Sequence, residues 1–163
     1  MKKDIVDEML QQWGDEHPNK DVSALEVIVS IQILGKLLKR QTTSALAKHG
    51  LKHWEYDALS VLRRQGAPFE MAATDIARAA LLTTGAMTTR VDGLESRGLV
   101  RRRRSKSDGR SIPVRLTGKG KQIIDLAVDT RINDANKALA QFSDREKKHL
   151  AAGLRNLLSQ IEQ

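Results

Sequence analysis

The sequence predicts a mainly α-helical protein: a winged helix-turn-helix with a small β-hairpin wing, whose amino- and carboxy-terminal helices form a dimerisation region. Three observations predict this class. A short helical pattern over residues 81–98 is followed directly by a basic hairpin pattern over residues 99–116. Most of the positive charge lies in that stretch. The two ends of the chain carry helical patterns with more apolar surface than one small unit covers.

The charge distribution is informative because it is uneven. The net charge is +8, and residues 97–121 alone contain ten basic residues and one acid, Asp108, while the other 138 residues sum to −1. A basic patch on a nearly neutral scaffold indicates a polyanionic partner. The absence of cysteine excludes disulfides and Cys-liganded zinc. With no signal-peptide core and no long apolar run, we expect a soluble, cytoplasmic protein.

The first half of the chain predicts three helices. Apolar residues from Ile5 to Trp13 share one face of a short helix that ends at Gly14 and Pro18. A long helix follows, capped by Asp21 or by a Ser23–Glu26 box, and closes at Gly50. Its wide apolar set predicts packing on two sides. The third helix spans residues 52–64.

The second half predicts the winged unit and two further helices. Residues 68–71 are extended enough for an edge strand, and Thr74 caps the next helix. The helix of the basic stretch begins at residues 83–85 and ends at Gly98, and strands run from residue 99 to 104 and from 112 to 116. Thr117 caps a helix to about residue 139, and Ser143 with Glu146 forms a capping box for the last helix.

These elements indicate a single domain over residues 1–163. Residues 51–117 form the winged helix-turn-helix core, and residues 1–48 and 118–163 form the helical dimerisation region. A dimer interface built from both chain ends would cover the excess apolar surface. A monomeric helical bundle around the winged unit is the alternative.

The basic stretch supplies the three kinds of group that duplex DNA requires. Short polar residues at the start of the helix suit the major groove, cations at the wing neutralise phosphates, and a basic wing tip suits the minor groove. An acid at the tip can hold the tip arginine extended. The candidate DNA-binding residues are Thr83, Thr84, Gly85, Thr88, Thr89, Arg101, Arg103, Arg104, Lys106, Asp108 and Arg110.

The stretch resembles the MarR family of bacterial transcriptional regulators. The residues that carry the resemblance are the Leu94-Glu95-x-x-Gly98-Leu99-Val100 junction, the Asp108-x-Arg110 wing and the Val114-x-Leu116-Thr117-x-x-Gly120 exit. The resemblance implies a triangular homodimer, all-helical except for the wing, on a palindromic operator near a divergent promoter. It also implies a small ligand that weakens DNA binding.

A narrower resemblance is to the urate-responsive branch of that family. It implies a ligand site made of Trp13 from the first helix, Asp57, Arg90, and Arg102 at the start of the wing. An anionic purine needs a cation and a flat surface, and an anion that competes for the arginine would break an Asp57–Arg90 pair. The alternatives are a phenolic or aromatic acid as ligand, or a structural ion pair and a core tryptophan with no ligand.

Other chemistry is weakly indicated. His49 and His53 are four residues apart, but Gly50 interrupts the helix between them, so we expect no metal site. We also expect no cofactor and no enzymatic activity, because no catalytic carboxylate pair, Ser/His arrangement or nucleotide loop is present. The sequence therefore predicts a ligand-responsive, sequence-specific DNA-binding regulator, and a repressor in particular. An architectural DNA-binding protein is the alternative, and an RNA-binding role is disfavoured by the five aromatic residues.

Overall fold

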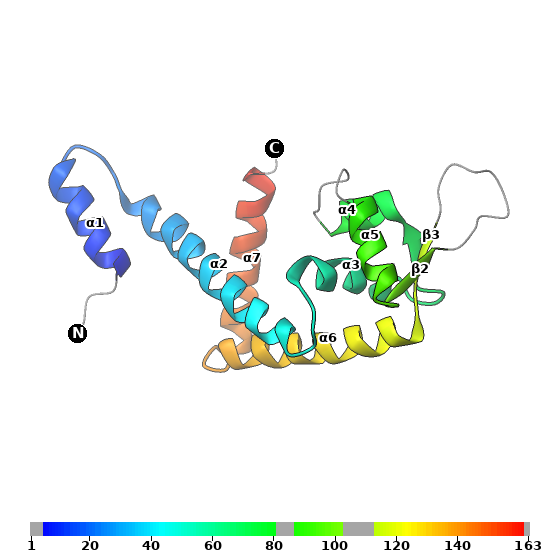
Figure 1. Cartoon of the computed structure of the whole chain (residues 1–163). Coiled ribbons are helices and arrows are strands. Elements are labelled where there is room, and N and C mark those ends of the chain that lie inside the picture. Colours follow the sequence, from blue (N-terminus) through cyan, green and yellow to red (C-terminus); the bar gives the residue numbers. More distant parts are fainter. Residues whose placement is uncertain (1–4, 81–86, 103–112, 162–163) are drawn as a thin grey trace.

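The computed structural model describes residues 5–80, 87–102 and 113–161, which form seven helices and three short strands (Figure 1). The predicted Thr83–Gly85 helix start and the turn of the wing lie outside these ranges. In chain order the elements are α1 (Ile5–Glu16), α2 (Ser23–Ala47), α3 (His53–Arg64), β1 (Glu70–Ala72), α4 (Ala73–Ala79), α5 (Met87–Ser96), β2 (Val100–Arg102), β3 (Pro113–Leu116), α6 (Gly118–Ala138) and α7 (Asp144–Ile161).

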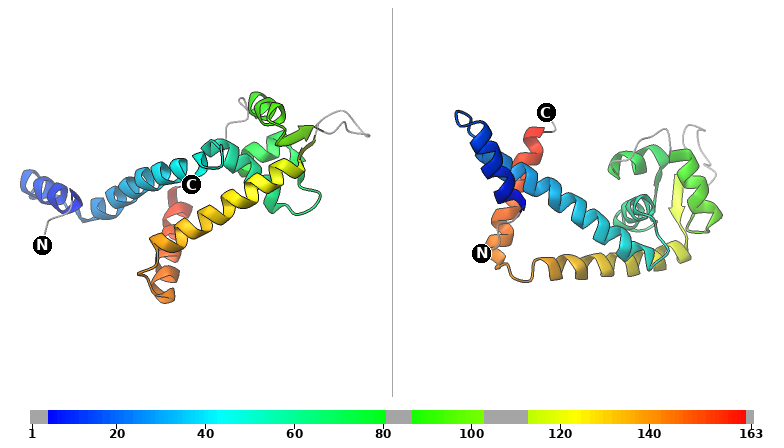
Figure 2. Two further views of the ribbon diagram at one scale, coloured as in Figure 1. Left: turned by 60° about the horizontal axis from the view of Figure 1, so that its bottom comes forward. Right: turned by 60° about the vertical axis from the view of Figure 1, so that its left-hand side comes forward.

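The elements separate into a lobe and two helical arms. Helices α3, α4 and α5 gather with the strands at one end, and we call this the winged lobe (Figure 1). Helices α2 and α6 leave the winged lobe and diverge, and α1 and α7 lie at their far ends (Figure 2). The fold is therefore the predicted winged helix-turn-helix between terminal helices.

The strands form a three-stranded antiparallel sheet in the order β1-β3-β2. Val114 on β3 lies between Met71 on β1 and Arg102 on β2. Arg115 lies between Glu70 and Arg101 in the next row. Because side chains alternate along a strand, the first row faces the core and the second faces away from it. Val114 is accordingly buried and Arg101 is exposed.

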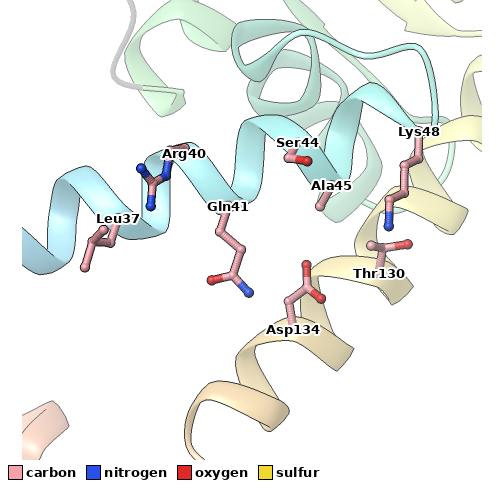
Figure 3. Close-up of a pocket in the computed structure, with 8 residues that line it drawn as sticks. All are labelled: Leu37, Arg40, Gln41, Ser44, Ala45, Lys48, Thr130 and Asp134. Atoms are coloured by element: carbon pink, nitrogen blue, oxygen red, sulfur yellow. The ribbon is translucent and has the colours of Figure 1, made fainter.

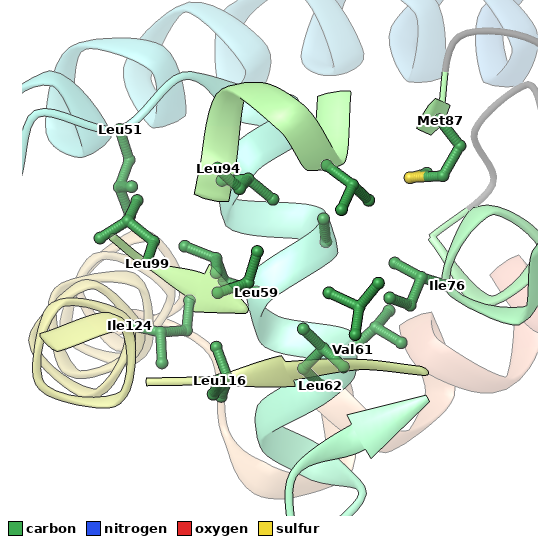
Figure 4. Packing of buried hydrophobic residues seen from close by; sticks show 14 of the residues in the cluster. Leu51, Leu59, Val61, Leu62, Ile76, Met87, Leu94, Leu99, Leu116 and Ile124 are labelled. Carbon is green, nitrogen blue, oxygen red and sulfur yellow. The ribbon is translucent and has the colours of Figure 1, made fainter. Parts of the chain in front are cut away.

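The hydrophobic core lies inside the winged lobe and extends to the adjacent ends of α2 and α6 (Figure 4). Leucines and valines from α3, α5 and the strands pack against the first half of α6, and Ile76 closes the cluster from α4. The largest fully buried side chains are Leu46, Leu59, Leu62, Ile76, Leu94, Leu99, Ile124, Val61, Val91, Val100 and Val114. This core packs α5 against the base of the wing.

Two glycines are required where α5 meets the wing. Gly98 has φ of +67°, a left-handed conformation that suits glycine at a helix end. Gly120, in the first turn of α6, packs so closely that an added Cβ would lie 2.0 Å from the carbonyl oxygen of Leu99. Any larger residue there would separate α6 from the start of the wing.

The predicted helix caps are partly confirmed. Thr117 accepts a hydrogen bond from the Gly120 amide at 3.0 Å, and Ser143 and Glu146 exchange the bonds of a capping box. The Ser23–Glu26 box is wrong: Ser23 is already the first residue of α2, and its amide donates to Asp21 instead. The Thr74 cap is also wrong, because α4 begins one residue earlier at Ala73.

The helical arms bury very little. Neither α1 nor α7 contains a buried residue, and α2 buries only Thr42, Ala45 and Leu46 near its end. Helix α1 continues through Gly14 to Glu16, beyond the predicted end. The exposed large apolar residues on the arms are Ile5, Trp13, Leu25, Val27, Ile28, Leu34, Leu37, Leu38, Leu126, Ile132, Phe142, Leu150, Leu154, Leu158 and Ile161.

Candidate nucleic-acid interface and ligand site

Helix α5 presents a polar face away from the core. Met87, Val91 and Leu94 are buried, whereas Thr88 and Thr89 are exposed on the other side of the helix. This amphipathic split is what a recognition helix needs, since one face must pack and the other must reach base edges. Of the predicted helix residues, Thr83, Thr84 and Gly85 lie outside the described residues.

The two described arginines at the base of the wing have different surroundings. Arg101 is exposed in the outward row of the sheet, opposite Arg115. Like charges directly opposite each other destabilise a sheet, so this pairing suits a strand that meets an anion. Arg102 belongs to the inward row and is only 28% exposed. The remaining predicted wing residues, Arg103, Arg104, Lys106, Asp108 and Arg110, lie outside the described residues.

Arg102 joins β2 to α5 through two carboxylates. Its Nη1 lies 2.6 Å from Glu95 Oε2 and its Nη2 lies 2.5 Å from Asp92 Oδ1. The Arg102 backbone amide donates to Glu95 Oε1 at 2.7 Å, and Nη2 also donates to the Thr88 carbonyl at 3.4 Å. Asp92 and Glu95 are three residues apart and therefore share one helix face. We call this set the Arg102 bridge.

The protonation equilibria of the Arg102 bridge favour its charged form. Hydrogen bonds from the backbone and side chain of Arg102 hold the pKa of Glu95 below its usual value. Burial opposes the charge on Arg102, but its hydrogen bonds to Glu95 and Asp92 outweigh that effect and raise its pKa. The pKa shifts of Glu95 and Arg102 therefore both favour the ion pair between them near neutral pH.

A second ion pair involves Arg97, the residue directly after α5. Arg97 Nη1 donates to both oxygens of Glu55 at 2.6 and 2.7 Å, and its Nη2 donates to the Gly50 carbonyl at 2.7 Å. The Glu55 side chain is 4% exposed and also accepts from the Lys52 amide. This pair ties the end of α5 to the connection between α2 and α3. Sequence reasoning did not identify it, because the partners are 42 residues apart.

The predicted pair between Asp57 and Arg90 is absent from the structure, and this is a correction. Asp57 Oδ2 lies 3.0 Å from His53 Nδ1, one turn earlier on α3. The Arg90 guanidinium lies over the Trp54 ring instead, 5.5 Å from its centroid. Its buried Nη1 atom has no hydrogen-bond partner among the described residues. A buried, unpaired guanidinium nitrogen is costly, and an anion or a water would satisfy it.

Trp13 is far from those residues within one chain. Helix α1 packs beside α2 at the end of the molecule opposite α3 and α5 in all three views (Figures 1 and 2). The Trp13 ring stacks on His17 at 5.4 Å and remains 46% exposed. One chain therefore does not bring the four predicted ligand residues together.

Two cavities of the structure lie away from the predicted ligand site. A cleft of about 640 Å³ opens between α2 and α6, lined by Leu37, Arg40, Gln41, Ser44, Ala45, Lys48, Thr130 and Asp134 (Figure 3). Another of about 530 Å³ lies along α3 and α6, beside Tyr56, Arg63 and Asp125. None of Trp13, Asp57, Arg90 and Arg102 lines either one.

Two of the four histidine side chains have hydrogen-bond partners. His49 Nε2 lies 2.8 Å from Thr130 Oγ1, and His53 bonds to Asp57. Within residues 5–80, 87–102 and 113–161, no group of three or more His, Cys, Asp or Glu side chains has a metal-binding arrangement. Over the same ranges no helix combines the length and apolarity needed to cross a membrane.

Comparisons with known proteins match the winged lobe and the whole chain to DNA-binding transcriptional regulators. The family profile described as MarR family matches residues 49–111, which include α3 to β2. The chain is 33% identical over 157 residues to the HTH-type transcriptional regulator PecS of Dickeya dadantii, which covers 96% of this chain and 92% of that protein. By its name, that relative is a transcriptional regulator.

Solved structures show the same architecture. A MarR family protein from Bacillus stearothermophilus superposes with a TM-score of 0.71 at 25% identity, covering 86% of this chain and 96% of that one. The S. aureus MepR–DNA complex gives a TM-score of 0.71 at 19% identity, covering 82% and 96%. At that identity the second comparison supports the fold alone.

Proposed function

The chain belongs to the MarR family of DNA-binding transcriptional regulators, and on that premise we propose that it is a homodimeric repressor released from a palindromic operator by a small anionic ligand. Urate is the first candidate ligand. The observation that carries the proposal is the division of α5, which packs with Met87, Val91 and Leu94 and exposes Thr88 and Thr89 beside the basic wing. We attribute no catalytic step to this arrangement.

We propose that the DNA contacts comprise three sets. Thr83, Thr84, Gly85, Thr88 and Thr89 would meet the major groove, and Arg101, Arg103, Arg104 and Lys106 would neutralise phosphates. Arg110, held extended by Asp108, would enter the minor groove. The charge of +9 over residues 97–121 supports these assignments, because it is confined to the wing and its flanks.

The exposed apolar residues of α1, α2 and α7 support the homodimer. Leucines and isoleucines on these helices have no cover within one chain, and a patch of that extent is typical of an interface. A two-fold axis at the arms would separate the winged lobes and place their α5 helices on successive half-sites of a palindrome. The proposed domain division, with residues 51–117 reading DNA and residues 1–48 and 118–163 dimerising, follows from this.

Arg90 supports the ligand site. Its unpaired, buried Nη1 and the Trp54 ring over which it lies provide a cation and a flat surface for an anionic aromatic molecule. Asp57 and Arg102 would border the site from α3 and β2. Trp13 reaches it only from a second subunit, because α1 lies at the opposite end of its own chain.

A gel shift on duplex DNA from upstream of the protein's own gene, with and without urate, tests the proposal. A complex that urate releases is the expected result. Release by a phenolic acid but not by urate would replace the ligand, and a complex that no anion releases would favour an architectural role. If the protein binds no duplex from a random library, sequence-specific DNA binding is contradicted.

Two variants assign the contacts. Arg110→Ala should cost about 1–3 kcal/mol of operator binding with an unchanged melting temperature, whereas Arg145→Ala on the distant α7 should cost nothing.

Asp57→Asn should blunt the urate response more than DNA binding, with Asp129→Asn on the exposed face of α6 as the matched control. Equal responses in Asp57→Asn and the parent would move the ligand elsewhere.

A further inference from the structure

We propose that Arg102 is a positioning residue: by bridging Asp92 and Glu95 it fixes the angle between the recognition helix and the wing, and so sets operator affinity and specificity without binding phosphate itself. The helix and the wing must meet the major and minor grooves at the same time. Their relative orientation therefore matters as much as the residues they carry. The inference rests on the proposed use of α5 and the wing to read DNA.

The geometry of the Arg102 bridge makes it a rigid connection. Glu95 accepts from both the side chain and the backbone amide of Arg102, so one carboxylate holds the strand as well as the guanidinium. The same guanidinium reaches Asp92 through its other terminal nitrogen. Two contacts from the planar guanidinium and one from the backbone amide define an orientation that a single contact would not.

The neighbouring arginine shows that position in the strand decides the role. Arg101 and Arg102 are consecutive, so their side chains point to opposite faces of the sheet. Arg101 is exposed and has no carboxylate partner among the described residues, so it is available to an anion. Arg102 has two carboxylate partners, so a phosphate would have to compete with both.

The two carboxylates have an electrostatic cost that the bridge explains. Asp92 and Glu95 lie on the helix that reads DNA, where negative charge repels phosphate. With Arg102 the set still sums to −1. Asp92 and Glu95 therefore weaken the general attraction between α5 and DNA. We attribute their presence on α5 to the Arg102 bridge, which orients the helix and the wing for a particular DNA sequence.

The first test exchanges arginine for lysine at both positions, which leaves the net charge unchanged. Binding is measured on a duplex selected from a random library by the parent protein and on a scrambled duplex of equal length. Arg102→Lys keeps the charge but loses the planar fork, so affinity for the selected duplex should fall about tenfold, as expected for one lost hydrogen bond between charged groups. Affinity for the scrambled duplex should stay as in the parent. Arg101→Lys should change both affinities less than threefold or so, since lysine also neutralises phosphate.

The second test removes a carboxylate and predicts an effect opposite to simple electrostatics. Glu95→Ala should weaken binding to the selected duplex, although it removes a negative charge from the interface. Asp75→Ala is the matched control, because Asp75 on α4 pairs only loosely with exposed Arg78 at 3.4 Å. It should strengthen binding to both duplexes by similar factors.

The outcomes separate the inference from the proposed function. If Arg102→Lys and Arg101→Lys lower both affinities alike, or if Glu95→Ala strengthens binding to both duplexes as Asp75→Ala does, the positioning role is wrong. If the parent protein selects no duplex, the proposed function fails and the inference fails with it. Should Glu95→Ala not fold, Asp92→Ala leaves both Glu95 contacts in place and should give a smaller shift in the same direction.

Discussion

The winged lobe and the helical arms solve the problem of burial in opposite ways. The winged lobe buries the hydrophobic cluster from Leu46 to Ala127 within one chain. The arms carry comparable apolar residues, but α1 and α7 have none buried, and among the described residues the exposed large hydrophobic side chains lie on α1, α2, α6 from Leu126 onward, or beyond α6. The winged lobe therefore packs within one chain, whereas the arms expose the apolar surface that the proposed homodimer would bury.

Disrupting the winged lobe should have the largest effect. Leu59 is fully buried in the centre of the cluster, so Leu59→Ala would leave a cavity and cost about 2–5 kcal/mol of unfolding free energy. Urea unfolding followed by circular dichroism measures the loss, and operator binding should fall with it. Leu25→Ala, at an exposed leucine of α2, is the control. When the protein is measured as a monomer, this variant should lose much less unfolding free energy than Leu59→Ala. Similar losses for both variants would contradict the division into two regions.

Disrupting the arms should affect association before folding. Leu34→Glu places a charge in the exposed apolar face of α2 and should raise the dimer dissociation constant by about thirtyfold or more, the effect of losing about 2 kcal/mol at an interface hot spot. Light scattering over a concentration series measures the dissociation constant, and circular dichroism should still report a folded winged lobe.

Leu34→Met keeps the apolar surface and should preserve the dimer. If Leu34→Glu has the same mass and operator affinity as the parent, α2 does not form the interface. If the parent is itself monomeric at all concentrations, the helical arms are covered in some other way and the palindromic operator loses its support.

The contact between α6 and the end of α2, where the two arms meet, should have a smaller effect. Thr130 Oγ1 on α6 donates to the Leu126 carbonyl at 3.0 Å and accepts from His49 Nε2, just beyond the end of α2, at 2.8 Å. Thr130→Val removes the acceptor and should cost about 1 kcal/mol. Thr43→Val removes only the equivalent bond within a helix, from Thr43 to the Lys39 carbonyl, and should cost less. Equal costs from urea unfolding would show that the His49 contact contributes nothing.

The same division explains what the sequence could and could not predict. The winged fold followed from local signals: helical spacing at Met87, Val91 and Leu94, glycine at the end of α5, and a basic hairpin. The Thr117 cap and the Ser143–Glu146 box were predicted correctly because their hydrogen bonds join residues only three positions apart in the sequence. The predicted Thr74 and Ser23 caps were wrong because the two helices begin after Ala72 and Val22, apolar residues whose side chains cannot cap, so neither cap position carries a polar side chain.

The candidate site depended on longer-range contacts, and those were harder to predict. The Asp57–Arg90 pair was expected from a resemblance, but His53 is one turn from Asp57 and satisfies it locally. The Arg97–Glu55 pair joins residues with no common pattern. Glu95 and Asp92 had a usable signal, since acids three residues apart on a helix beside a basic strand favour an ion pair across the junction. The ligand assignments themselves stay predictions.

The pH dependence of the Arg102 bridge gives the smallest and most local test. The pKa of Glu95 is lower in the folded protein than its ordinary value of about 4.3, because Arg102 donates hydrogen bonds to its carboxylate. The ionised carboxylate therefore stabilises the fold fully above about pH 4.3, and this contribution is lost as the pH falls through the lower folded pKa. The difference in melting temperature between the parent and Glu95→Gln should be present from pH 5 to 7 and should shrink as the pH falls below about 4.3 and through the lower folded pKa. A difference that is constant across this range would mean that the ionisation of Glu95 does not stabilise the junction. Because Glu95 belongs to the winged lobe, the effect should persist in Leu34→Glu, where the interface between arms is disrupted but the lobe remains folded.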